Sequence, residues 1–449
     1  MKVLHLVHGW YPESAGGTEG YIRDLLLGQR RLGIEPKLVC GSFTPWETAG
    51  IEEVEVQGER VLRVHRDDHW FDWHAKSWHP GVESLLEALF ARERPDLIHV
   101  HHWIRLTCNI VEIADRLGIP AVVTLHDLYS SCPRVFRVRP GDEACFRPLS
   151  IASCRDCVPR MGHESMREIE AGIALFQDQY RSELALARAV ITATSATADL
   201  IAEKAGIERA KFRSLPLGYE PRFPARAPTP AALPGRDEPL RLCYWGNLTR
   251  RKGTHVLVKA FRAVCERSRP GRYELHLAGK VDRGEFESEL RELARDLPVV
   301  FHGRYSYEQL AGLGIHLAVF PMICFETFGF VLDECFELGL SAIVTDIGAM
   351  PERAGAAARI VPRNDVAALA AAIEEFGVAP EKLAAMRTRI PSRSPLPEEH
   401  AAQLRDIYVE ALGSLRNRAE VIPMLRRAHF LLLQRESAER KIAPPGGPL

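Results

Sequence analysis

Short runs of apolar and β-branched residues alternate along the chain with longer segments in which apolar residues recur every three or four positions. The short runs predict strands and the longer segments predict helices, because side chains return to one face every two residues in a strand and about every 3.6 in a helix. Such alternation is typical of a parallel sheet with helices on both faces. The first half predicts helices at residues 20–33 and from about 160 to 188, and strands at residues 3–7, 35–40, 96–101, 121–126 and 189–194.

A proline-rich segment interrupts this pattern. Residues 219–239 contain six prolines in 21 positions and almost no periodic apolar signal, which predicts an interdomain linker. We therefore expect two parallel α/β domains, at 1–218 and 240–396, that face each other across a cleft lined by strand-to-helix loops. In the second domain, strands are predicted at residues 240–246, 273–279, 299–303, 317–321 and 341–346.

Two further helices are predicted in the tail, residues 397–449. The first covers 397–415, and the second, 422–441, is both apolar and basic. Its apolar residues are Leu425, Phe430, Leu432 and Leu433, and its basic residues are Arg426, Arg427, Arg435, Arg440 and Lys441. Two alternatives follow: the helix packs against the body through its apolar stripe, or it lies on an anionic membrane surface.

Composition narrows the class of protein. The 449 residues carry 58 Lys and Arg against 59 Asp and Glu, which argues against binding of nucleic acid by bulk charge. The hydrophobic fraction of 46% is that of a folded chain and excludes disorder over most of the length. The apolar run from Val3 to Val7 is too short for a signal peptide or a membrane span. We therefore expect a cytoplasmic protein, associated with a membrane only if the tail helix binds one.

Two loops that follow predicted strands carry candidate anion-binding groups. Gly16 and Gly17 precede a predicted helix, so bare backbone amides could approach an anion there, although paired glycines are also common in turns. In the second half, Arg250, Arg251 and Lys252 follow the strand at 240–246. These three cations form either a diphosphate site or a solvated basic turn.

A third loop, PMICFETFGFVLDECFELG at 321–339, follows a strand and leads into a helix near Phe330. Glu326 lies in the loop, Gly329 at the start of the helix and Glu334 inside it. A helix N-terminus with a bare backbone at Gly329 suits phosphate oxygens, and the two carboxylates suit hydroxyl groups on either side.

Glu326 and Glu334, with TFGFVLD between them, resemble the E-x7-E signature of retaining glycosyltransferases of the family 4 type, which have the GT-B fold and use nucleotide-sugar donors. Five further segments match this family in order along the chain: GGTE at 16–19, PDLIHVHH at 95–102, VVTLHD at 122–127, YWGNLTRRKG at 244–253 and IGAMPE at 347–352. The resemblance implies two Rossmann-like domains, the first on the acceptor side and the second binding the nucleotide-sugar, followed by a helical tail.

The resemblance also implies a role for each matching residue. Glu334 would hold the ribose hydroxyls of the nucleotide, and Glu326 would contact hydroxyls of the transferred sugar. His126 would lie beneath the sugar ring, near the anomeric carbon, and stabilise the reacting sugar. The diphosphate would be bound by the side chains of Lys252 and Arg251, the backbone amides of Phe328 and Gly329, and the glycines Gly16 and Gly17. The catalytic residues would thus be His126, Lys252 and Glu326.

Three positions depart from the family pattern. Asn247 stands in the donor site where the family commonly has Arg, so Arg250 or Arg251 would supply the missing charge. Ala349 replaces the second glycine of the segment at 347–352, and the serine that commonly precedes the first glutamate is absent from PMICFE. None of these changes removes a carboxylate or the lysine of the expected site.

The expected reaction transfers a sugar from a UDP- or GDP-sugar to a saccharide or lipid-linked glycan, with retention of configuration and without a metal ion. Arg251, Lys252 and a helix N-terminus would stabilise the charge that develops on the leaving diphosphate. Two alternatives stay open: a nucleotide-sugar epimerase of the same fold, and a non-catalytic protein that binds nucleotide-sugars.

A cysteine-rich insert at about 128–160 lies outside the family motifs. Cys132, Cys145, Cys154 and Cys157 form a C-x12-C-x8-C-x2-C pattern that suits tetrahedral zinc, which would order a segment too short to have its own core. Independent reduced thiols or a redox pair are the alternatives. Catalysis is expected to need no cofactor.

Overall fold

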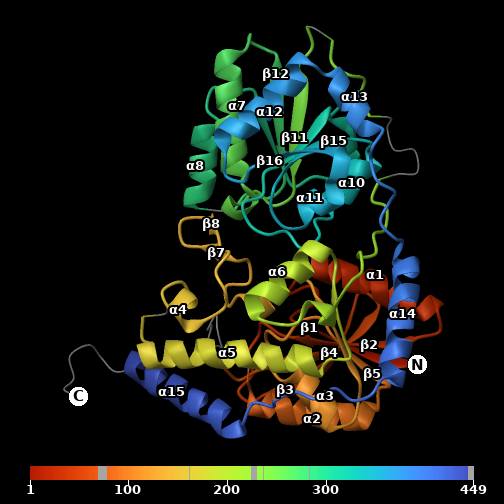
Figure 1. Ribbon diagram of the computed structural model, residues 1–449, viewed down its shortest axis with the longest axis vertical. Helices are drawn as coiled ribbons and strands as arrows, with labels where there is room; N and C mark the ends of the chain where they lie inside the picture. Colours follow the sequence, from red (N-terminus) through yellow and green to blue (C-terminus); the bar gives the residue numbers. More distant parts are fainter. Residues whose placement is uncertain (69–77, 161, 224–229, 236, 283, 443–449) are drawn as a thin grey trace. The chain divides into compact units, whose positions relative to one another are not determined.

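The computed structural model describes residues 1–68, 78–160, 162–223, 230–235, 237–282 and 284–442 (Figure 1). It divides into two compact units. Unit 1 comprises Met1–Arg137, Phe146–Gly218 and Pro395–Leu449, and unit 2 comprises Val138–Cys145 and Tyr219–Ser394. Part of the proline-rich linker, residues 224–229 and 236, lies outside the described residues, as do the side chains of Arg440 and Lys441.

Unit 1 is built on an eight-stranded sheet of order β10-β9-β6-β5-β1-β2-β4-β3. Its strands are β1 (Lys2–Val7), β2 (Glu35–Gly41), β3 (Gly50–Val56), β4 (Glu59–His65), β5 (Leu97–Val100), β6 (Ala121–Leu125), β9 (Ala189–Thr192) and β10 (Phe212–Ser214). Every pairing is parallel except that of β3 with β4. This hairpin was not predicted from the sequence pattern. It turns at Gln57 and Gly58, both with positive φ, the conformation that a two-residue hairpin turn requires.

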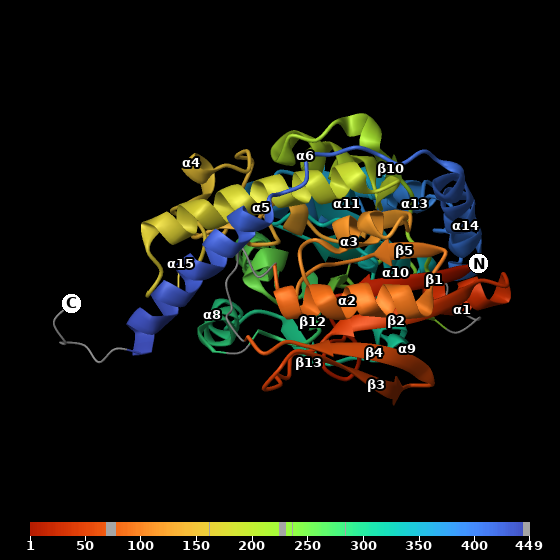
Figure 2. The same ribbon diagram turned by 90° about the horizontal axis from the view of Figure 1, so that it is seen from below.

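Helices cover this sheet, and the chain returns to it at its C-terminal end. The helices of unit 1 are α1 (Gly17–Arg31), α2 (Pro80–Glu93), α3 (Ile110–Arg116), α4 (Ile151–Cys154), α5 (Met166–Leu186), α6 (Ser195–Ala205), α14 (Pro397–Gly413) and α15 (Met424–Ile442). Helix α14 packs closely on α1, because a Cβ at Gly28 would lie 2.9 Å from the carbonyl oxygen of Pro397. Helix α15 runs beside α5 in both views of Figures 1 and 2.

The tail helix α15 uses one face to pack. Phe430 and Leu433 are buried, and Phe430 joins a small apolar cluster with Leu175 of α5. Leu425 and Leu432, in contrast, are 83% and 55% exposed. The predicted apolar stripe is therefore two stripes, one packed against α5 and one facing solvent.

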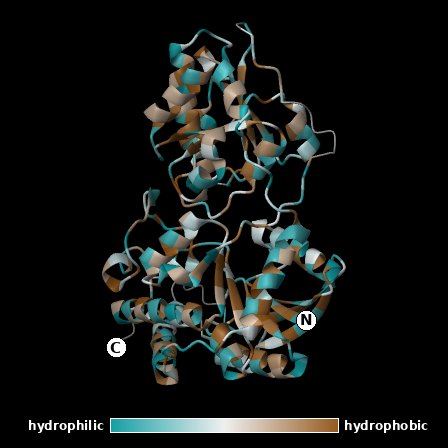
Figure 3. Ribbon diagram, turned by 45° about the vertical axis from the view of Figure 1, so that its right-hand side comes forward, coloured by the Kyte–Doolittle hydropathy of each residue, from teal (hydrophilic) through white to brown (hydrophobic). Residues whose placement is uncertain are grey.

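Unit 2 is a six-stranded parallel sheet of order β13-β12-β11-β14-β15-β16. Its strands are β11 (Leu240–Trp245), β12 (Tyr273–Ala278), β13 (Val299–Gly303), β14 (Leu317–Phe320), β15 (Ser341–Thr345) and β16 (Ala358–Val361). Its helices are α7 (Thr254–Arg267), α8 (Glu285–Leu293), α9 (Tyr307–Gly312), α10 (Val331–Glu337), α11 (Ala349–Ala354), α12 (Val366–Val378) and α13 (Glu381–Arg387). Apolar residues, brown in the ribbon of Figure 3, concentrate along the central strands and form the buried core of this unit.

Both units are α/β domains with a Rossmann-like strand order, and each has a point at which that order reverses. In unit 2 the chain proceeds from β11 outward to β13, then crosses back to β14 and continues the other way. Loops after the two strands beside such a reversal diverge and leave a crevice in which α/β proteins bind ligands. In unit 2 these are the loops that follow β11 and β14, and they contain Lys252 and Glu326. In unit 1 they are the loops that follow β1 and β5.

Candidate functional site

The loops after β11 and β14 are joined directly to each other. The backbone N–H groups of Ile323 and Cys324 donate to the carbonyl oxygen of Arg251, at 3.1 and 3.3 Å. Gly253 has φ +71°, and a Cβ there would lie 1.8 Å from the carbonyl oxygen of Pro321. Only glycine meets both conditions, so the glycine of the RRKG segment sets how closely the two loops approach.

This approach brings Lys252 and Glu326 together. The Lys252 ammonium donates a hydrogen bond to a carboxylate oxygen of Glu326, and both side chains are partly exposed. Burial disfavours the charged lysine, but the adjacent Glu326 carboxylate outweighs this effect and raises the pKa of Lys252. The lysine is therefore a fixed cation at the crevice.

A third segment, IGAMPE, fixes the backbone of Glu326. The N–H of Ala349 donates to the carbonyl oxygen of Glu326 at 2.7 Å. Gly348 has φ +66°, and a Cβ there would lie 2.6 Å from the backbone nitrogen of Glu326. The first glycine of this segment is thus required by close packing, whereas the position of Ala349 tolerates a side chain.

Arg353 is a residue that sequence reasoning missed. Its guanidinium donates to the carbonyl oxygens of Phe328 and Gly329, both at 3.0 Å, and lies 3.5 Å from the centre of the Phe328 ring. Across a trans peptide the next N–H points opposite to the carbonyl. The N–H groups of Gly329 and Phe330 therefore face away from Arg353. In the sequence, the feature that could have drawn attention to Arg353 is its position directly after the IGAMPE segment.

Glu334 is buried in α10, the helix that follows β14. Its two carboxylate oxygens accept hydrogen bonds from the Trp245 indole at 2.8 Å and the Tyr307 hydroxyl at 3.2 Å. Burial of the carboxyl group raises the pKa of Glu334 to about 7. Its E-x7-E partner Glu326 is also held in place, so both carboxylates have defined positions at the switch point.

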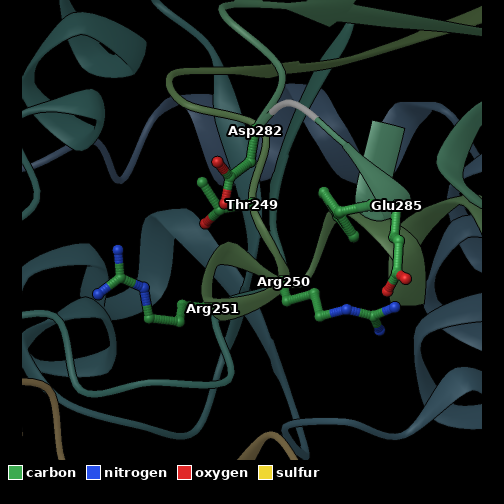
Figure 4. A pocket seen from close by; sticks show the side chains of 6 residues that line it. Thr249, Arg250, Arg251, Asp282 and Glu285 are labelled. Atoms are coloured by element: carbon green, nitrogen blue, oxygen red, sulfur yellow. The ribbon is translucent and has the colours of Figure 1, made fainter. Parts of the chain in front are cut away.

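The cations of the RRKG segment have different surroundings. Arg250 forms ion pairs with Glu289 of α8 and, at 3.6 Å, with Asp142, and it lies over the Phe286 ring. Asp142 belongs to the hairpin of β7 (Val138–Arg139) and β8 (Glu143–Ala144). Arg251 extends in the opposite direction from the same loop (Figure 4).

A pocket of about 370 Å³ opens beside this segment. It is lined by Thr249, Arg250, Arg251, Asp282, Glu285 and Phe286 (Figure 4). Asn247 is exposed, and its backbone carbonyl accepts a hydrogen bond from the Tyr244 hydroxyl at 2.8 Å. Both arginines expected to substitute for the one that Asn247 replaces, Arg250 and Arg251, line this pocket.

In unit 1 the predicted residues lie at the carboxyl ends of β1 and β6. Gly17 begins α1, and Gly16 precedes it in an extended conformation that any residue can adopt. His126 follows β6 directly, and its Nε2 lies 2.9 Å from Nδ1 of His101. Burial lowers the pKa of His126 to about 3, so its ring is neutral.

The four cysteines of the insert are distributed over both units. Among the described residues, all ten cysteines of the chain are thiols. In the same part of the chain, the groups of three side chains close enough to share an ion are His5, His99 and His101, and Asp67, Asp68 and His79. Cys132, Cys154 and Cys157 of unit 1 form no such group, and Cys145 belongs to unit 2.

The sequence matches two known families. Residues 15–223 match the family described as Glycosyltransferase Family 4, and residues 239–376 match the family described as Glycosyl transferases group 1. The two matches cover the sheet of unit 2, the sheet of unit 1 from β2 onward, and the segments that hold Gly17, His126, Lys252, Glu326 and Glu334. No curated protein matches the chain.

Solved structures match almost the whole chain. Sucrose-phosphate synthase from Thermosynechococcus elongatus is 19% identical, with a TM-score of 0.61 over 92% of this chain and 100% of that one. A glycosyltransferase from Rickettsia africae is 16% identical, with a TM-score of 0.60 over 92% and 99%. HepE from Anabaena, solved in complex with UDP-glucose, is 17% identical, with a TM-score of 0.56 over 92% and 100%. At these identities the likeness establishes the fold. Within the described part of the chain, no helix is both long and apolar enough to cross a membrane.

Proposed function

The chain belongs to the GT-B glycosyltransferases of the family 4 type, and from this premise we propose that it transfers a sugar from a UDP- or GDP-sugar to a saccharide or lipid-linked glycan with retention of anomeric configuration. The observation that carries the proposal is the convergence of Lys252, Glu326 and Glu334 at the switch point of unit 2. HepE, which shares the fold, binds UDP-glucose through its own residues. A uridine nucleotide is therefore the first donor to test.

The proposed roles in the donor site follow from charge and position. Lys252 and Arg251 stabilise the negative charge that develops on the leaving diphosphate, with the backbone N–H groups of Phe328 and Gly329. Because two side-chain cations act at the leaving group, we propose that transfer requires no metal ion. Lys252 releases its contact with Glu326 when the diphosphate binds, and the freed carboxylate then accepts hydroxyl groups of the sugar.

Glu334 is proposed to bind the ribose. A ribose hydroxyl would donate to a carboxylate oxygen that already accepts from Trp245 or Tyr307, and each oxygen can accept two hydrogen bonds. Ribose contacts are alike in the ground and transition states, whereas contacts to the reacting sugar are not. Glu334→Ala should therefore mainly raise the donor KM, and Glu326→Ala should mainly lower kcat. Identical kinetic profiles for the two variants would overturn these separate roles.

A saccharide acceptor is supported by two aromatic side chains in the loop after β2. Trp46 is 40% exposed and stacks flat on His65, with ring centroids 4.1 Å apart. Phe43 is 46% exposed and lies beneath the Arg105 guanidinium. Each ring is supported on one side, which suits it to pack against the apolar C–H face of a sugar at little cost in conformational entropy.

Peripheral membrane contact of this cytoplasmic enzyme is proposed through the outer stripe of α15. Met424, Leu425 and Leu432 are 67%, 83% and 55% exposed, and Arg426 lies beside them. Apolar side chains next to basic ones are typical of helices that bind anionic lipid surfaces. Flotation with vesicles of neutral lipid and of neutral plus anionic lipid tests this contact, with Leu425→Glu as the disrupting variant. If partitioning to vesicles changes neither with anionic lipid nor with Leu425→Glu, the proposed membrane contact is contradicted.

A structural zinc ion at Cys132, Cys145, Cys154 and Cys157 is proposed on the C-x2-C spacing alone. Zinc bound by the four thiolates would order the insert. Elemental analysis of protein purified without added metal tests it. Well under one zinc per chain, together with four titratable thiols, would end the proposal.

One assay separates the transferase from the alternatives. Each of UDP-, GDP- and ADP-glucose is incubated with the enzyme and a panel of oligosaccharides, and nucleotide diphosphate and product linkage are measured by NMR. A transferase releases diphosphate only with acceptor, an epimerase converts the donor without release, and a binding protein does neither while its Tm rises. Product of inverted configuration would contradict the proposed retention.

A further inference from the structure

A chain of hydrogen-bonded imidazoles runs through the core of unit 1 to His126. Nε2 of His126 lies 2.9 Å from Nδ1 of His101, and Nε2 of His101 lies 3.0 Å from Nδ1 of His5. Nε2 of His5 lies 2.9 Å from Oε1 of Gln29 in α1. His5, His101 and Gln29 are at most 1% exposed. These hydrogen bonds thus connect His126, at the carboxyl end of β6, to the interior of unit 1.

The series of hydrogen bonds continues past Gln29 to the C-terminal helix α14. The Gln29 amide nitrogen donates to the Tyr408 hydroxyl at 3.1 Å, and that hydroxyl lies 2.6 Å from Nδ1 of His99. Nε2 of His99 in turn lies 2.7 Å from the Thr124 hydroxyl. Both nitrogens of His5, His99 and His101 therefore have a partner, which leaves none of the three rings with a lone pair for a metal ion.

The N–H donors along these hydrogen-bonded imidazoles must all be directed toward the same end of the series. Burial lowers the pKa of His5 to about 4 and that of His101 well below its ordinary value, so each ring is neutral and carries one proton. A neutral imidazole donates through one nitrogen and accepts through the other. Consequently the direction of one hydrogen bond fixes the direction of the next, from Gln29 to His126.

The direction of these hydrogen bonds is set at the Tyr408 end of the series. A phenol is a better donor than an imidazole, so Tyr408 donates to Nδ1 of His99 and accepts from the Gln29 amide nitrogen. Gln29 Oε1 must then accept from Nε2–H of His5. His5 accepts in turn from His101, and His101 accepts from Nε2–H of His126. An amide cannot take up a proton, so the chain orders protons and does not conduct them.

We propose that Gln29 and Tyr408 are positioning residues that, through His5 and His101, hold His126 as the Nε2–H tautomer with Nδ1 as a hydrogen-bond acceptor. The consequence for catalysis rests on the proposed function, in which His126 meets the reacting sugar and accepts a hydrogen bond from a sugar hydroxyl at Nδ1. The tautomer itself can be measured without any substrate. Reversing it would offer the sugar a donor where an acceptor is needed.

The test is ring ¹⁵N NMR of protein labelled at histidine, with the His126 signals assigned by their loss in His126→Gln. The expected spectrum has a protonated Nε2 and an unprotonated Nδ1 at His126. Tyr408→Phe removes the hydroxyl that orients Gln29, so the His126 signals should shift toward a mixture of tautomers. Tyr21→Phe removes a buried hydroxyl that bonds His400 outside the chain, so it controls for loss of packing and should leave the tautomer unchanged.

Two substitutions of Gln29, Gln29→Glu and Gln29→Met, complete the set of test variants. A carboxylate accepts from both His5 and Tyr408, so Gln29→Glu should keep the tautomer, whereas Gln29→Met should not. With active enzyme, Gln29→Met should lower kcat about tenfold at unchanged donor KM, and Gln29→Glu should restore it. A protonated Nδ1 at His126 in the parent protein, or a metal ion bound stoichiometrically at His5 and His101, would overturn the proposal. Absence of transferase activity would leave the NMR result unaffected.

Discussion

The ammonium group of Lys252 contacts the carboxylate of Glu326, a residue 74 positions further along the chain. The contact exists because β11 and β14 are neighbours in the sheet, although two strands lie between them in the sequence. It joins the cation of one motif to the first carboxylate of another. The two groups therefore neutralise each other, and in the proposed reaction the diphosphate replaces the carboxylate as the partner of the lysine.

We expect Lys252→Ala to lower kcat by about a hundredfold or more with saturating donor, because it removes a preorganised cation from the developing charge of the leaving group. Lys259→Ala, on the exposed face of the following helix α7, is the matched control and should leave kcat unchanged. Steady-state kinetics of both variants check this. Equal effects, or none in either, would mean that the charge is stabilised elsewhere.

Glu334 should make stability depend on pH. Its pKa is about 7 in the folded protein and 4.5 is its ordinary value, so between these values the folded state binds more protons than the unfolded state. Stability from this group is therefore lost as pH rises from about 4.5 to 7 and is constant above that range. Glu334→Gln removes the titration, so its Tm relative to the parent should rise across this interval. A difference in Tm that stays constant from pH 4.5 to 7 would contradict the assignment.

Gly253→Ala should destabilise unit 2 much more than Gly271→Ala. Both glycines have positive φ, +71° and +76°, so both substitutions carry the strain of about 1 to 2 kcal/mol of a left-handed residue. A Cβ at Gly271 meets nothing within 4 Å, whereas one at Gly253 collides with the Pro321 carbonyl. Chemical unfolding of the two variants measures the difference. Similar free energies of unfolding for the two variants would show that the loops after β11 and β14 can move apart without loss of stability.

Arg427 should anchor α15, and its neighbour Arg426 should not. Arg427 is 3% exposed, forms an ion pair with the buried Glu112, and donates to Gln179 at 3.0 Å. Arg427→Met leaves that carboxylate without its buried partner, at an expected cost of about 3 to 5 kcal/mol. Arg426 pairs with Asp178 at the surface, so Arg426→Met should cost less than about 1 kcal/mol. Urea unfolding of both variants is the measurement, and equal midpoints would contradict the anchoring role.

The sequence by itself determined the parallel α/β architecture of both units and the short motifs that carry the proposed donor site. Period-two and period-3.6 patterns identified the parallel strands and the helices between them, because those periods follow from backbone geometry. The motifs containing Lys252, Glu326 and Glu334 were identifiable because each is a short, continuous segment that joins a strand to a helix. Arg353 was missed because nothing in its own segment indicates that its partners are the carbonyls of Phe328 and Gly329.

Only the tertiary structure decided which separated segments meet. Residues 395–449 fold back onto unit 1, where Tyr408 bonds to Gln29 and His99. The hairpin that contains Asp142 belongs to unit 2, where Asp142 pairs with Arg250. The tertiary structure also divided the apolar residues of α15 between a buried and an exposed face. These contacts join residues more than a hundred positions apart in the chain. They depend on how whole elements pack, and local periodicity and motif spacing carry no information about that packing.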